Sequence, residues 1–323
     1  MTQNLRFSVL IPAYNATPFI EKALDSVRNQ SFTSYEVLIT NDGSVDTTEQ
    51  IITEYLNRYK DFPATLYNQE NKGIGGATNL ILQKAQGQYI ALLDADDFWY
   101  SNKLENVDRF LNENYAVDII CHNVLEVREN GSKRVLKCRK IGEPYFEDLL
   151  INGNGLFRSA TVIRSVLAQK LGGLSEDPDF NGADDYEFWL RLANEGAQFS
   201  ALHEVLGEYR RVTGSLTSKI EEHCEKCLNT RLYHMSCAAQ EGRYSPDKVI
   251  RMKNRIHREY LYSLARDFFY AGKMKESVRY YGDAIRHSPL WWKPYAGIID
   301  LLFKMPSFVI KSSKKHYGSS EKH

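Results

Sequence analysis

The sequence lacks any apolar run long enough to cross a membrane. Its 323 residues contain no stretch that approaches the roughly 20 consecutive apolar residues of a membrane-spanning helix. The N-terminal residues run directly into a strand-like segment, so no signal peptide is visible. These absences argue against an integral-membrane or secreted protein, and we expect a cytoplasmic one.

Cysteine is scarce and odd in number, which argues against a disulfide framework. The five cysteines are Cys121, Cys138, Cys224, Cys227 and Cys237. His223 and His234 lie near two of them, but the spacing lacks the second ligand pair of a zinc site, and the segment has a helical pattern. We therefore interpret the cysteines as free thiols and this segment as ordinary helix.

An excess of charge of either sign is also missing. Lys and Arg together number 41, and Asp and Glu also number 41, so the formal net charge is zero. A chain devoted to nucleic acid would carry a basic excess, so we expect no nucleic-acid partner. With 43% hydrophobic and 25% charged residues, the composition is that of a globular protein, and the length suffices for two domains.

Short apolar runs alternate with helical patterns through the first half of the chain. The runs expected to form buried strands are residues 6–11, 35–40, 64–68 and 88–93. Amphipathic segments separate them, and this alternation predicts an α/β fold with a mainly parallel sheet and helices on both faces. Ligands of such sheets bind beyond the carboxyl ends of the strands.

Three polar segments directly follow predicted strands and therefore meet at that edge. They are Pro12–Asn15, Asn41–Asp46 and Asp94–Asp97, and their convergence predicts a nucleotide site. Within the second segment, Asp42 can accept a hydrogen bond from a base such as uracil. Asp46 instead suits an Asx turn that leads into a helix.

The acidic run Asp94-Ala95-Asp96-Asp97 has the chemistry of a cation site. Two carboxylates at positions i and i+2 can approach one Mg²⁺ or Mn²⁺ ion, which prefers oxygen ligands and shares them with phosphates. Such a cation stabilises the charge of a departing diphosphate. Because Asp is also a common turn residue, the run alone leaves a plain turn as the alternative.

Two further segments can approach a ligand. Residues 71–79 carry glycines, including Gly73, that let backbone come close to a ligand, but they match neither a dinucleotide nor a P-loop pattern. Asp184 and Asp185 open an expected helix over 184–195. There they act either as caps or, in the case of one of them, as the general base for an attacking hydroxyl.

The second half of the chain has a different pattern. Asn130-Gly131 between two strand-like segments predicts a hairpin, and a helix is expected near 160–170. After about residue 216 the chain is helical, and residues 261–289 match either one tetratricopeptide repeat or a generic helical hairpin. We therefore expect a first domain over residues 1–215 and a helical region over 216–323.

The C-terminal end combines apolar side chains with lysines. Aromatic and aliphatic residues begin at Trp291 and Trp292, and residues 301–323 hold five lysines against one glutamate. Such a segment lies on an anionic membrane surface, packs on the first domain, or contacts a second copy in a homodimer. The first alternative would place the protein peripherally on the inner face of the plasma membrane.

Together these segments resemble family 2 glycosyltransferases, which have the GT-A fold and mostly invert configuration at the transferred sugar. The matching strings are S-V-L-I-P-A-Y-N (8–15), Y-E-V-L-I-T-N-D-G-S-V-D (35–46), N-K-G-I-G-G-A-T-N (71–79), L-L-D-A-D-D (92–97), L-G-G-L-S-E (171–176), A-D-D-Y-E-F-W-L-R-L (183–192) and Y-R-R-V-T-G-S (209–215). They occur in the family's order and spacing, and jointly they are highly specific.

The resemblance implies roles in nucleotide binding for residues of the first loops. Pro12, Ala13 and Tyr14 would hold the nucleotide, with Asn15 and Ala95 in the same binding loops. The side chain of Asp42 would contact the base. Gly73 would line the same pocket.

For the acids, the resemblance implies a division of labour. Asp94 and Asp96 would form the family's D-x-D motif around Mn²⁺ or Mg²⁺, with Asp96 favoured as the direct ligand. Asp97 would lie close to the donor sugar or the acceptor. Asp185 would be the catalytic base. Asp184 beside it, which stands where the family has Glu, would contact the substrate or nucleotide.

The chain departs from the family most clearly at Val212. Many relatives carry a His there, which in some helps to bind the metal, so a third protein ligand is not expected here. The chain also has no Q-x-x-R-W motif, so it does not resemble processive cellulose- or hyaluronan-type synthases.

The implied activity is inverting, metal-dependent transfer of a sugar from a nucleoside diphosphate sugar to an acceptor hydroxyl. UDP is the favoured carrier, and a glycan or lipid-linked acceptor in cell-surface polysaccharide or lipid-linked glycan synthesis is the expected context. A sugar-phosphate nucleotidyltransferase would need a glycine-rich, basic loop after the first strand, which this chain lacks. The other alternative is a non-catalytic scaffold that binds nucleotide sugars and acts through its C-terminal helices.

Overall fold

The computed structural model describes residues 5–211 and 219–304 of the chain. It divides the chain into two compact units, Met1–Tyr244 and Ser245–His323. Val212 and the lysine-rich end of the chain lie outside the described residues.

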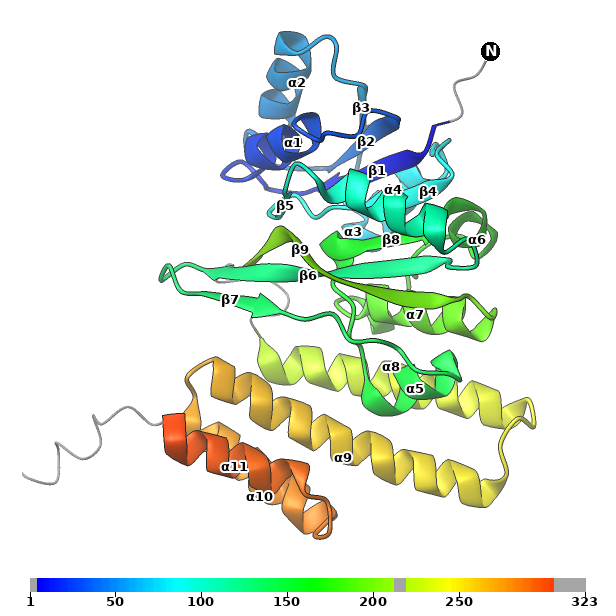
Figure 1. The fold of residues 1–323 in the computed structure, drawn as a ribbon, viewed down its shortest axis with the longest axis vertical. Helices are drawn as coiled ribbons and strands as arrows, with labels where there is room; N and C mark the ends of the chain where they lie inside the picture. Colours follow the sequence, from blue (N-terminus) through cyan, green and yellow to red (C-terminus); the bar gives the residue numbers. More distant parts are fainter. Residues whose placement is uncertain (1–4, 212–218, 305–323) are drawn as a thin grey trace, which may run out of the picture. The chain divides into compact units, whose positions relative to one another are not determined.

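The first unit is built on a single sheet with helices around it (Figure 1). Its strands are β1 (Phe7–Ala13), β2 (Tyr35–Asp42), β3 (Ala64–Gln69), β4 (Tyr89–Leu92), β5 (Phe98–Trp99), β6 (Ile119–Arg128), β7 (Lys133–Leu136), β8 (Thr161–Arg164) and β9 (Phe199–Arg211). Its helices are α1 (Ile20–Arg28), α2 (Thr48–Arg58), α3 (Gly73–Leu82), α4 (Lys103–Glu113), α5 (Tyr145–Asn152), α6 (Ser165–Lys170), α7 (Asp184–Asn194) and α8 (Ile220–Gln240), with 3-10 turns η1 (Arg158–Ala160) and η2 (Pro178–Phe180).

The strand order is β3-β2-β1-β4-β8-β6-β9-β5, with β7 paired to β6. The four strands expected from the first half of the chain, β1 to β4, pair in parallel, so the predicted α/β fold is confirmed. Beyond β4 the sheet is mixed, because β8 pairs antiparallel to both β4 and β6 while β6 and β9 run parallel.

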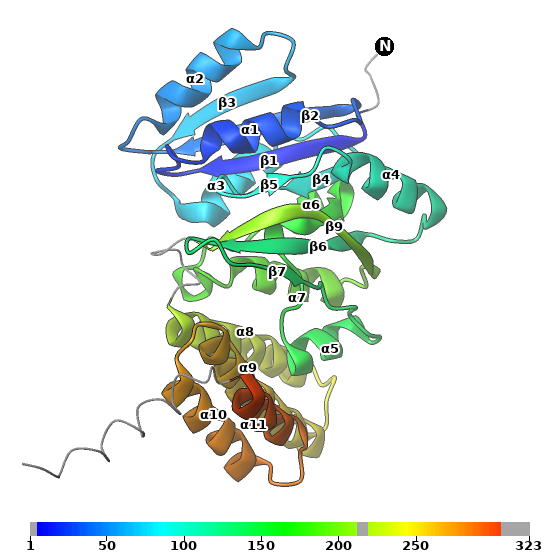
Figure 2. The same cartoon turned by 60° about the vertical axis from the view of Figure 1, so that its left-hand side comes forward.

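Strand β1 lies between β2 and β4 in the parallel half of the sheet, and all seven of its residues are buried. Its odd-numbered residues pack in one core with the apolar sides of α1, α2 and α4. Helix α3 lies against β1 and β2 (Figure 2). It buries Ile81 and Leu82 outside that core. Because helices cover both faces of this sheet, polar side chains lie mainly in the loops that follow the strands.

Two expectations for the middle of the chain have different outcomes. The hairpin at Asn130-Gly131 is confirmed, since β6 and β7 pair antiparallel and Gly131 has a φ of +79°. The helix expected near 160–170 is wrong in its first part. Residues 161–164 form strand β8, whose β-branched side chains are buried between β4 and β6, and the helix begins only at Ser165.

The boundary between the two units differs from the expected one at residue 215. Helix α8 belongs to the first unit because it contacts α5 and α7. Arg231 on α8, 4% exposed, donates to the carbonyl oxygens of Leu150 and Ile151 at the end of α5. A purely helical composition could not reveal that this helix completes the first unit.

The second unit consists, within its described residues, of α9 (Pro246–Tyr270), α10 (Met274–His287) and α11 (Lys293–Lys304). Gly272, with a φ of +77°, makes the turn between α9 and α10. Ala265, Tyr281 and Leu301 form a small core from all three helices. A helical hairpin over 261–289 is therefore present, whereas its kinship to a tetratricopeptide repeat stays a prediction. None of the helices described in the chain is long and apolar enough to span a membrane.

Candidate active site

The loops after β1 and β2 are hydrogen-bonded to each other at the edge of the sheet. Asn15 Oδ1 accepts from the backbone N–H of Val45 at 2.9 Å, and the backbone N–H of Asn15 donates to Ser44 Oγ at 3.0 Å. Asn15 has a φ of +49°, a conformation that Asn tolerates better than most residues. Its observed contacts therefore hold the two loops in register.

The residues around Asn15 differ in what they expose. Pro12 and Ala13 are buried within β1, so only their backbone borders the loop, whereas Tyr14 is 51% exposed. Asp46 accepts from the N–H and the hydroxyl of Thr48, the first residue of α2, as expected for an Asx turn at a helix start. Asp46 is thus engaged in local structure.

Asp42 lies buried at the end of β2 and connects it to the next loop. Its Oδ1 accepts from Gln69 Nε2 at 2.6 Å and from the backbone N–H of Lys72 at 2.9 Å. Gly73 follows with a φ of +74°, and a Cβ added there would meet no atom within 4 Å. Open backbone at Gly73 and a fixed carboxylate at Asp42 therefore lie side by side after neighbouring strands.

The acidic segment after β4 forms a tight turn held from two sides. The N–H of Asp97 donates to the Asp94 carbonyl at 3.0 Å, and the N–H of Asp94 donates to Ser159 Oγ at 3.1 Å. The Asp97 carboxylate accepts from the backbone N–H of Arg210 on β9 at 2.7 Å. Ala95 is buried within the turn, so its side chain is structural and its backbone alone can meet a ligand.

The carboxyl groups of this turn repel one another in a poorly hydrated setting. Burial and the nearby Asp94 charge raise the pKa of Asp96 to about 6. Burial and the charges of Asp96 and Asp94 raise the pKa of Asp97 well above its usual range. Asp97 Oδ2 is buried without an aligned hydrogen-bond partner among the residues that the structure describes. Such a cluster favours a cation that would relieve the repulsion.

A divalent metal fits these donors only with help from a ligand. Within residues 5–211 and 219–304, no three His, Cys, Asp or Glu side chains are grouped as a ready-made metal site. Asp94 and Asp96 offer the hard oxygen ligands that Mg²⁺ and Mn²⁺ prefer. A metal held by one or two carboxylates, diphosphate oxygens and water suits this arrangement.

Arg158, a residue that sequence analysis missed, connects the acids of the two halves of the site. It is 9% exposed, and its Nε lies 3.1 Å from Asp94 Oδ1 while its Nη1 lies 3.4 Å from Asp184 Oδ2. It also donates to Thr78 Oγ1 on α3. The sequence signal is slight, since Arg158 stands alone at the end of a loop rich in Gly and Asn.

Asp184 and Asp185 begin α7 but face different surroundings. Asp184 is 6% exposed and is held in the ion pair with Arg158. Asp185 is half-buried, and burial together with the Asp184 charge raises its pKa to about 7. The charge of Asp94 also raises this pKa. A carboxyl group with this pKa is suited to proton transfer near neutral pH.

The predicted site residues thus fall into two neighbouring groups. The residues expected to bind nucleotide come from the loops after β1, β2 and β3. Hydrogen bonds of Asn15 and Asp42 connect these loops. The acids of the turn and of α7 meet around Arg158. Asp184 acts in the structure as an ion-pair partner, and its contact with a ligand stays a prediction. The metal-binding consequence expected from Val212 lies outside the described residues.

Comparison with known proteins adds sequence relatives. A family model described as "Glycosyl transferase family 2" matches residues 8–169. The chain is 30% identical over 212 residues to the putative teichuronic acid biosynthesis glycosyltransferase TuaG of Bacillus subtilis, covering 65% of this chain and 81% of that protein. It is 27% identical to the amylovoran biosynthesis glycosyltransferase AmsB of Erwinia amylovora, covering 65% and 71%.

Solved structures share the fold. The crystal structure of S. aureus TarS 1-349 in complex with UDP-GlcNAc matches with a TM-score of 0.63 and 18% identity, over 88% of this chain and 81% of that one. The mannosyltransferase PcManGT from Pyrobaculum calidifontis, in complex with GDP-Man and Mn²⁺, matches with a TM-score of 0.59 and 18% identity, over 96% and 84%. At this identity the likeness shows the GT-A fold alone.

Proposed function

The chain belongs to glycosyl transferase family 2 and is a glycosyltransferase, and on that premise we propose its reaction. It transfers a sugar, with inversion and with a divalent metal, from a nucleoside diphosphate sugar to an acceptor hydroxyl. The observation that carries this proposal is the Asp185 carboxyl group, half-buried beside Asp184 and Arg158 with a pKa of about 7. Because general bases work best with a pKa near the operating pH, Asp185 is the proposed base.

The donor binds, in this proposal, at the loops after β1, β2 and β3. Asp42 accepts a hydrogen bond from the base, which favours uracil and hence UDP, and the open backbone at Gly73 lets the nucleotide come close. The UDP-GlcNAc in TarS and the GDP-Man in PcManGT support a nucleoside diphosphate sugar as the class of donor. Tyr14, whose side chain is 51% exposed in the first loop, contacts the nucleotide in this proposal.

Asp94 and Asp96 would hold the metal together with oxygens of the donor diphosphate and water. Bound Mn²⁺ or Mg²⁺ would neutralise the charge that develops on the departing diphosphate. Asp97 stays fastened to the Arg210 backbone and keeps the turn in place beside the donor sugar. The Mn²⁺ in the PcManGT complex supports this assignment of the metal class.

Transfer takes place in one displacement. The acceptor oxygen forms a bond to the anomeric carbon, the bond from that carbon to the diphosphate breaks, and its electron pair leaves with the diphosphate. The proton of the acceptor hydroxyl passes to Asp185. Attack from the face opposite the leaving group inverts the configuration. Arg158 is a positioning residue, because it pairs with Asp94 of the acidic turn and with Asp184 beside the proposed base.

The acceptor is, we infer, a growing polysaccharide or a lipid-linked glycan. TuaG and AmsB carry names that place them in teichuronic acid and amylovoran biosynthesis, and both are sequence relatives over most of their own length. This supports the class of acceptor and leaves the transferred sugar open.

A thermal-shift panel followed by one variant tests the reaction. Nucleotide sugars with Mn²⁺ or Mg²⁺ should raise the Tm of the full chain, because a ligand that binds only the folded state stabilises it. Asp185→Asn should retain that shift and lose transfer by about 10²–10⁴-fold, the usual contribution of a general base. Asp179→Asn, at an exposed acid of η2, is the matched control. An Asp185→Asn protein that turns over like the wild type would refute the base assignment.

The scaffold alternative is tested by the same preparation. Wild-type protein that hydrolyses its best donor slowly in the presence of Mn²⁺ is an enzyme. If donor binds and neither hydrolysis nor transfer occurs with any acceptor, a non-catalytic scaffold is the better description.

We propose a peripheral membrane contact through α11. Trp292, directly before α11, is 69% exposed, and Tyr295 and Ile299 on α11 are 42% and 52% exposed. Exposed aromatic and aliphatic side chains at this spacing, with lysines following in the sequence, suit an anionic lipid surface. Flotation with phosphatidylglycerol vesicles should fall when Trp292 and Ile299 are both changed to Ser. Equal flotation would exclude the membrane, and a dimer that these changes dissociate would show a contact between copies.

A further inference from the structure

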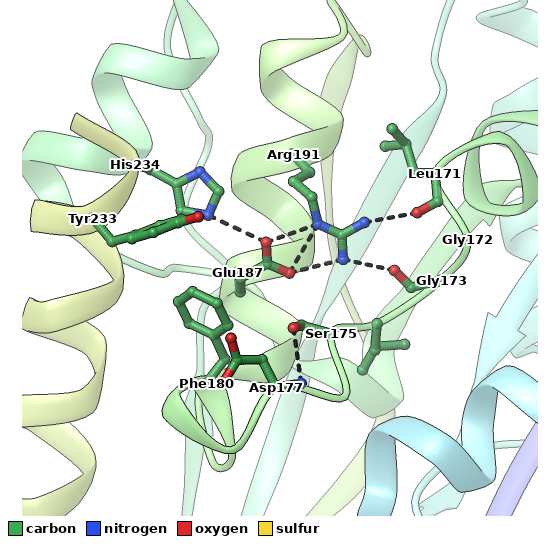
Figure 3. A pocket seen from close by; sticks show the side chains of 11 residues that line it. Leu171, Gly172, Gly173, Ser175, Asp177, Phe180, Glu187, Arg191, Tyr233 and His234 are labelled. Atoms are coloured by element: carbon green, nitrogen blue, oxygen red, sulfur yellow. Dashed lines mark hydrogen bonds and ion pairs between the residues drawn. The ribbon is translucent and has the colours of Figure 1, made fainter. Parts of the chain in front are cut away.

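A cavity of about 420 Å³ lies between the loop 171–175, η2, α7 and α8 (Figure 3). This volume falls in the range of small-molecule sites, roughly 300–1,000 Å³. None of the residues proposed above to hold donor, metal or base lines it. The cavity lies wholly within the first unit.

An ion network forms the floor of this cavity and leaves little free charge. Arg191 Nε donates to both Glu187 oxygens at 2.7 and 2.9 Å, and its two terminal nitrogens donate to the carbonyl oxygens of Leu171 and Gly173. Glu187 Oε1 also lies 3.2 Å from His234 Nε2. Figure 3 shows Arg191 pointing between Glu187 and the loop 171–175. The cation is therefore neutralised before any ligand arrives.

Aromatic rings make the wall on the side of α8. The Tyr233 ring lies 5.4 Å from Phe180 and 5.3 Å from His234, edge to face in both pairs. Tyr233 is 54% exposed, so part of its ring surface is open to a ligand. The Asp177 carboxylate and the Ser175 hydroxyl lie at the rim on the loop side.

The chemistry of the lining selects one class of ligand. A phosphate would meet the Asp177 carboxylate, and Arg191 is already paired with Glu187, so an anion is disfavoured. A purely apolar molecule would leave the polar rim unsatisfied. An aromatic surface beside a carboxylate and a hydroxyl suits a neutral molecule with an apolar ring face and many hydroxyl groups. We propose that this cavity binds a sugar residue of the glycan acceptor, an inference that rests on the proposed function.

The position of the cavity makes this sugar a distal unit of the acceptor rather than the reacting one. Asp185 and Glu187 lie two residues apart on α7 and therefore point to different sides of the helix. The loop between the cavity and the donor side is fastened to α3, where Asn79 donates to the Leu174 carbonyl and accepts from its N–H, both at 2.9 Å. Helix α7 and this loop thus join the cavity to the proposed site of reaction.

Saturation-transfer NMR on the full chain without donor tests this inference. The probes are maltotriose, cellotriose, chitotriose and mannotriose, with inorganic pyrophosphate as the anionic comparison. At least one trisaccharide should bind, and Tyr233→Ala should raise its dissociation constant by about tenfold or more, the factor that corresponds to 1.4 kcal/mol. Tyr233→Phe should bind like the wild type because it keeps the ring. Tyr115→Ala, at a tyrosine that is 77% exposed elsewhere in the first unit, is the matched control.

A second pair of variants tests the carboxylate. Asp177→Asn keeps the hydrogen bond to the Asp179 N–H that begins η2, since Asn is also a favoured cap, yet it should weaken trisaccharide binding. Asp179→Asn removes the same charge outside the cavity and should not. The inference is overturned if no trisaccharide binds, if binding survives Tyr233→Ala unchanged, or if pyrophosphate displaces the sugar. Trisaccharide binding in a protein that neither binds nor hydrolyses any donor would retain the cavity assignment and refute the proposed function.

Discussion

Replacing Arg158 by Met tests whether this side chain organises the active site. Met has a similar length and no charge, so it fills the space between Asp94 and Asp184 without pairing with either. Arg158 is buried, and so is Asp184, whereas Asp94 is about one quarter exposed in its side chain. The substitution therefore leaves at least one carboxylate buried without its partner.

The stability cost follows from that burial. Removing one partner of a buried ion pair costs about 3–5 kcal/mol in free energy of unfolding. For a unit of this size, about 2–4 °C of Tm corresponds to each kcal/mol, so we expect a decrease of roughly 6–20 °C. Arg58→Met is the matched control, because the Arg58–Glu21 pair is about half exposed on both sides. It should cost less than about 1 kcal/mol.

The kinetic consequence has a defined sign. The Arg158 charge lowers the pKa of Asp185, which burial and Asp184 raise to about 7. Without Arg158 this pKa rises further, so the acidic limb of the pH–rate profile moves to higher pH. If the pKa of Asp185 rises by one unit, transfer at low pH should fall by about tenfold, and this loss should disappear at high pH. Donor hydrolysis or transfer measured from pH 5 to pH 9 gives the profile. If the variant folds and its acidic limb coincides with that of the wild type, Arg158 does not act on the base.

Three further predictions concern Asp185, the metal and the loop 171–175. Because the folded-state pKa of Asp185 lies above the ordinary value for Asp, its contribution to stability is present below about pH 4 and lost as pH rises through about 7. Asp185→Asn should therefore raise the Tm at pH 8 and leave it nearly unchanged at pH 4, and an equal effect at both pH values would contradict the assigned shift. Mn²⁺ together with UDP should raise the Tm more than the sum of the two alone, since Asp94 and Asp96 need diphosphate oxygens to complete the site, and additive shifts or no effect of EDTA would count against it. Gly173→Ala should lower the Tm much more than Gly172→Ala. Both glycines have positive φ, but only at Gly173 would an added Cβ clash with Asn79 Oδ1. Gly172→Ala alone should cost about 1–2 kcal/mol, measured by urea unfolding.

Much of the parallel half of the sheet could be predicted because its cause is local. A strand with one exposed face would leave every second side chain of a continuous apolar run such as 6–11 in water. Such runs therefore indicate strands buried on both faces. The same logic placed Asp42 and Asp94 at strand ends, where β2 and β4 leave the sheet. The prediction of helix over residues 161–164 is wrong because a short run of β-branched residues beside a helix has no distinctive period of its own.

The electrostatic partners could not be predicted in the same way. Arg158 lies 64 residues after Asp94 and 26 before Asp184 in the chain, and only the meeting of η1, β4 and α7 brings the three charges together. The cavity beside Tyr233 likewise combines the loop 171–175 with α8, two segments that no motif connects. Long-range contacts of this kind depend on packing, which single-sequence patterns do not encode.

Local patterns of apolar, acidic and glycine residues were sufficient to predict the family, the α/β class and the acids on which the chemistry depends. Which of those acids is buried, which is paired and which can exchange a proton depends on the tertiary structure. It sets Asp184 against Arg158 and leaves Asp185 half-buried with a pKa of about 7, although the two residues are chemically identical and adjacent. The physical reason is that burial and the distance to other charges, rather than the residue type, decide how tightly a carboxyl group holds its proton.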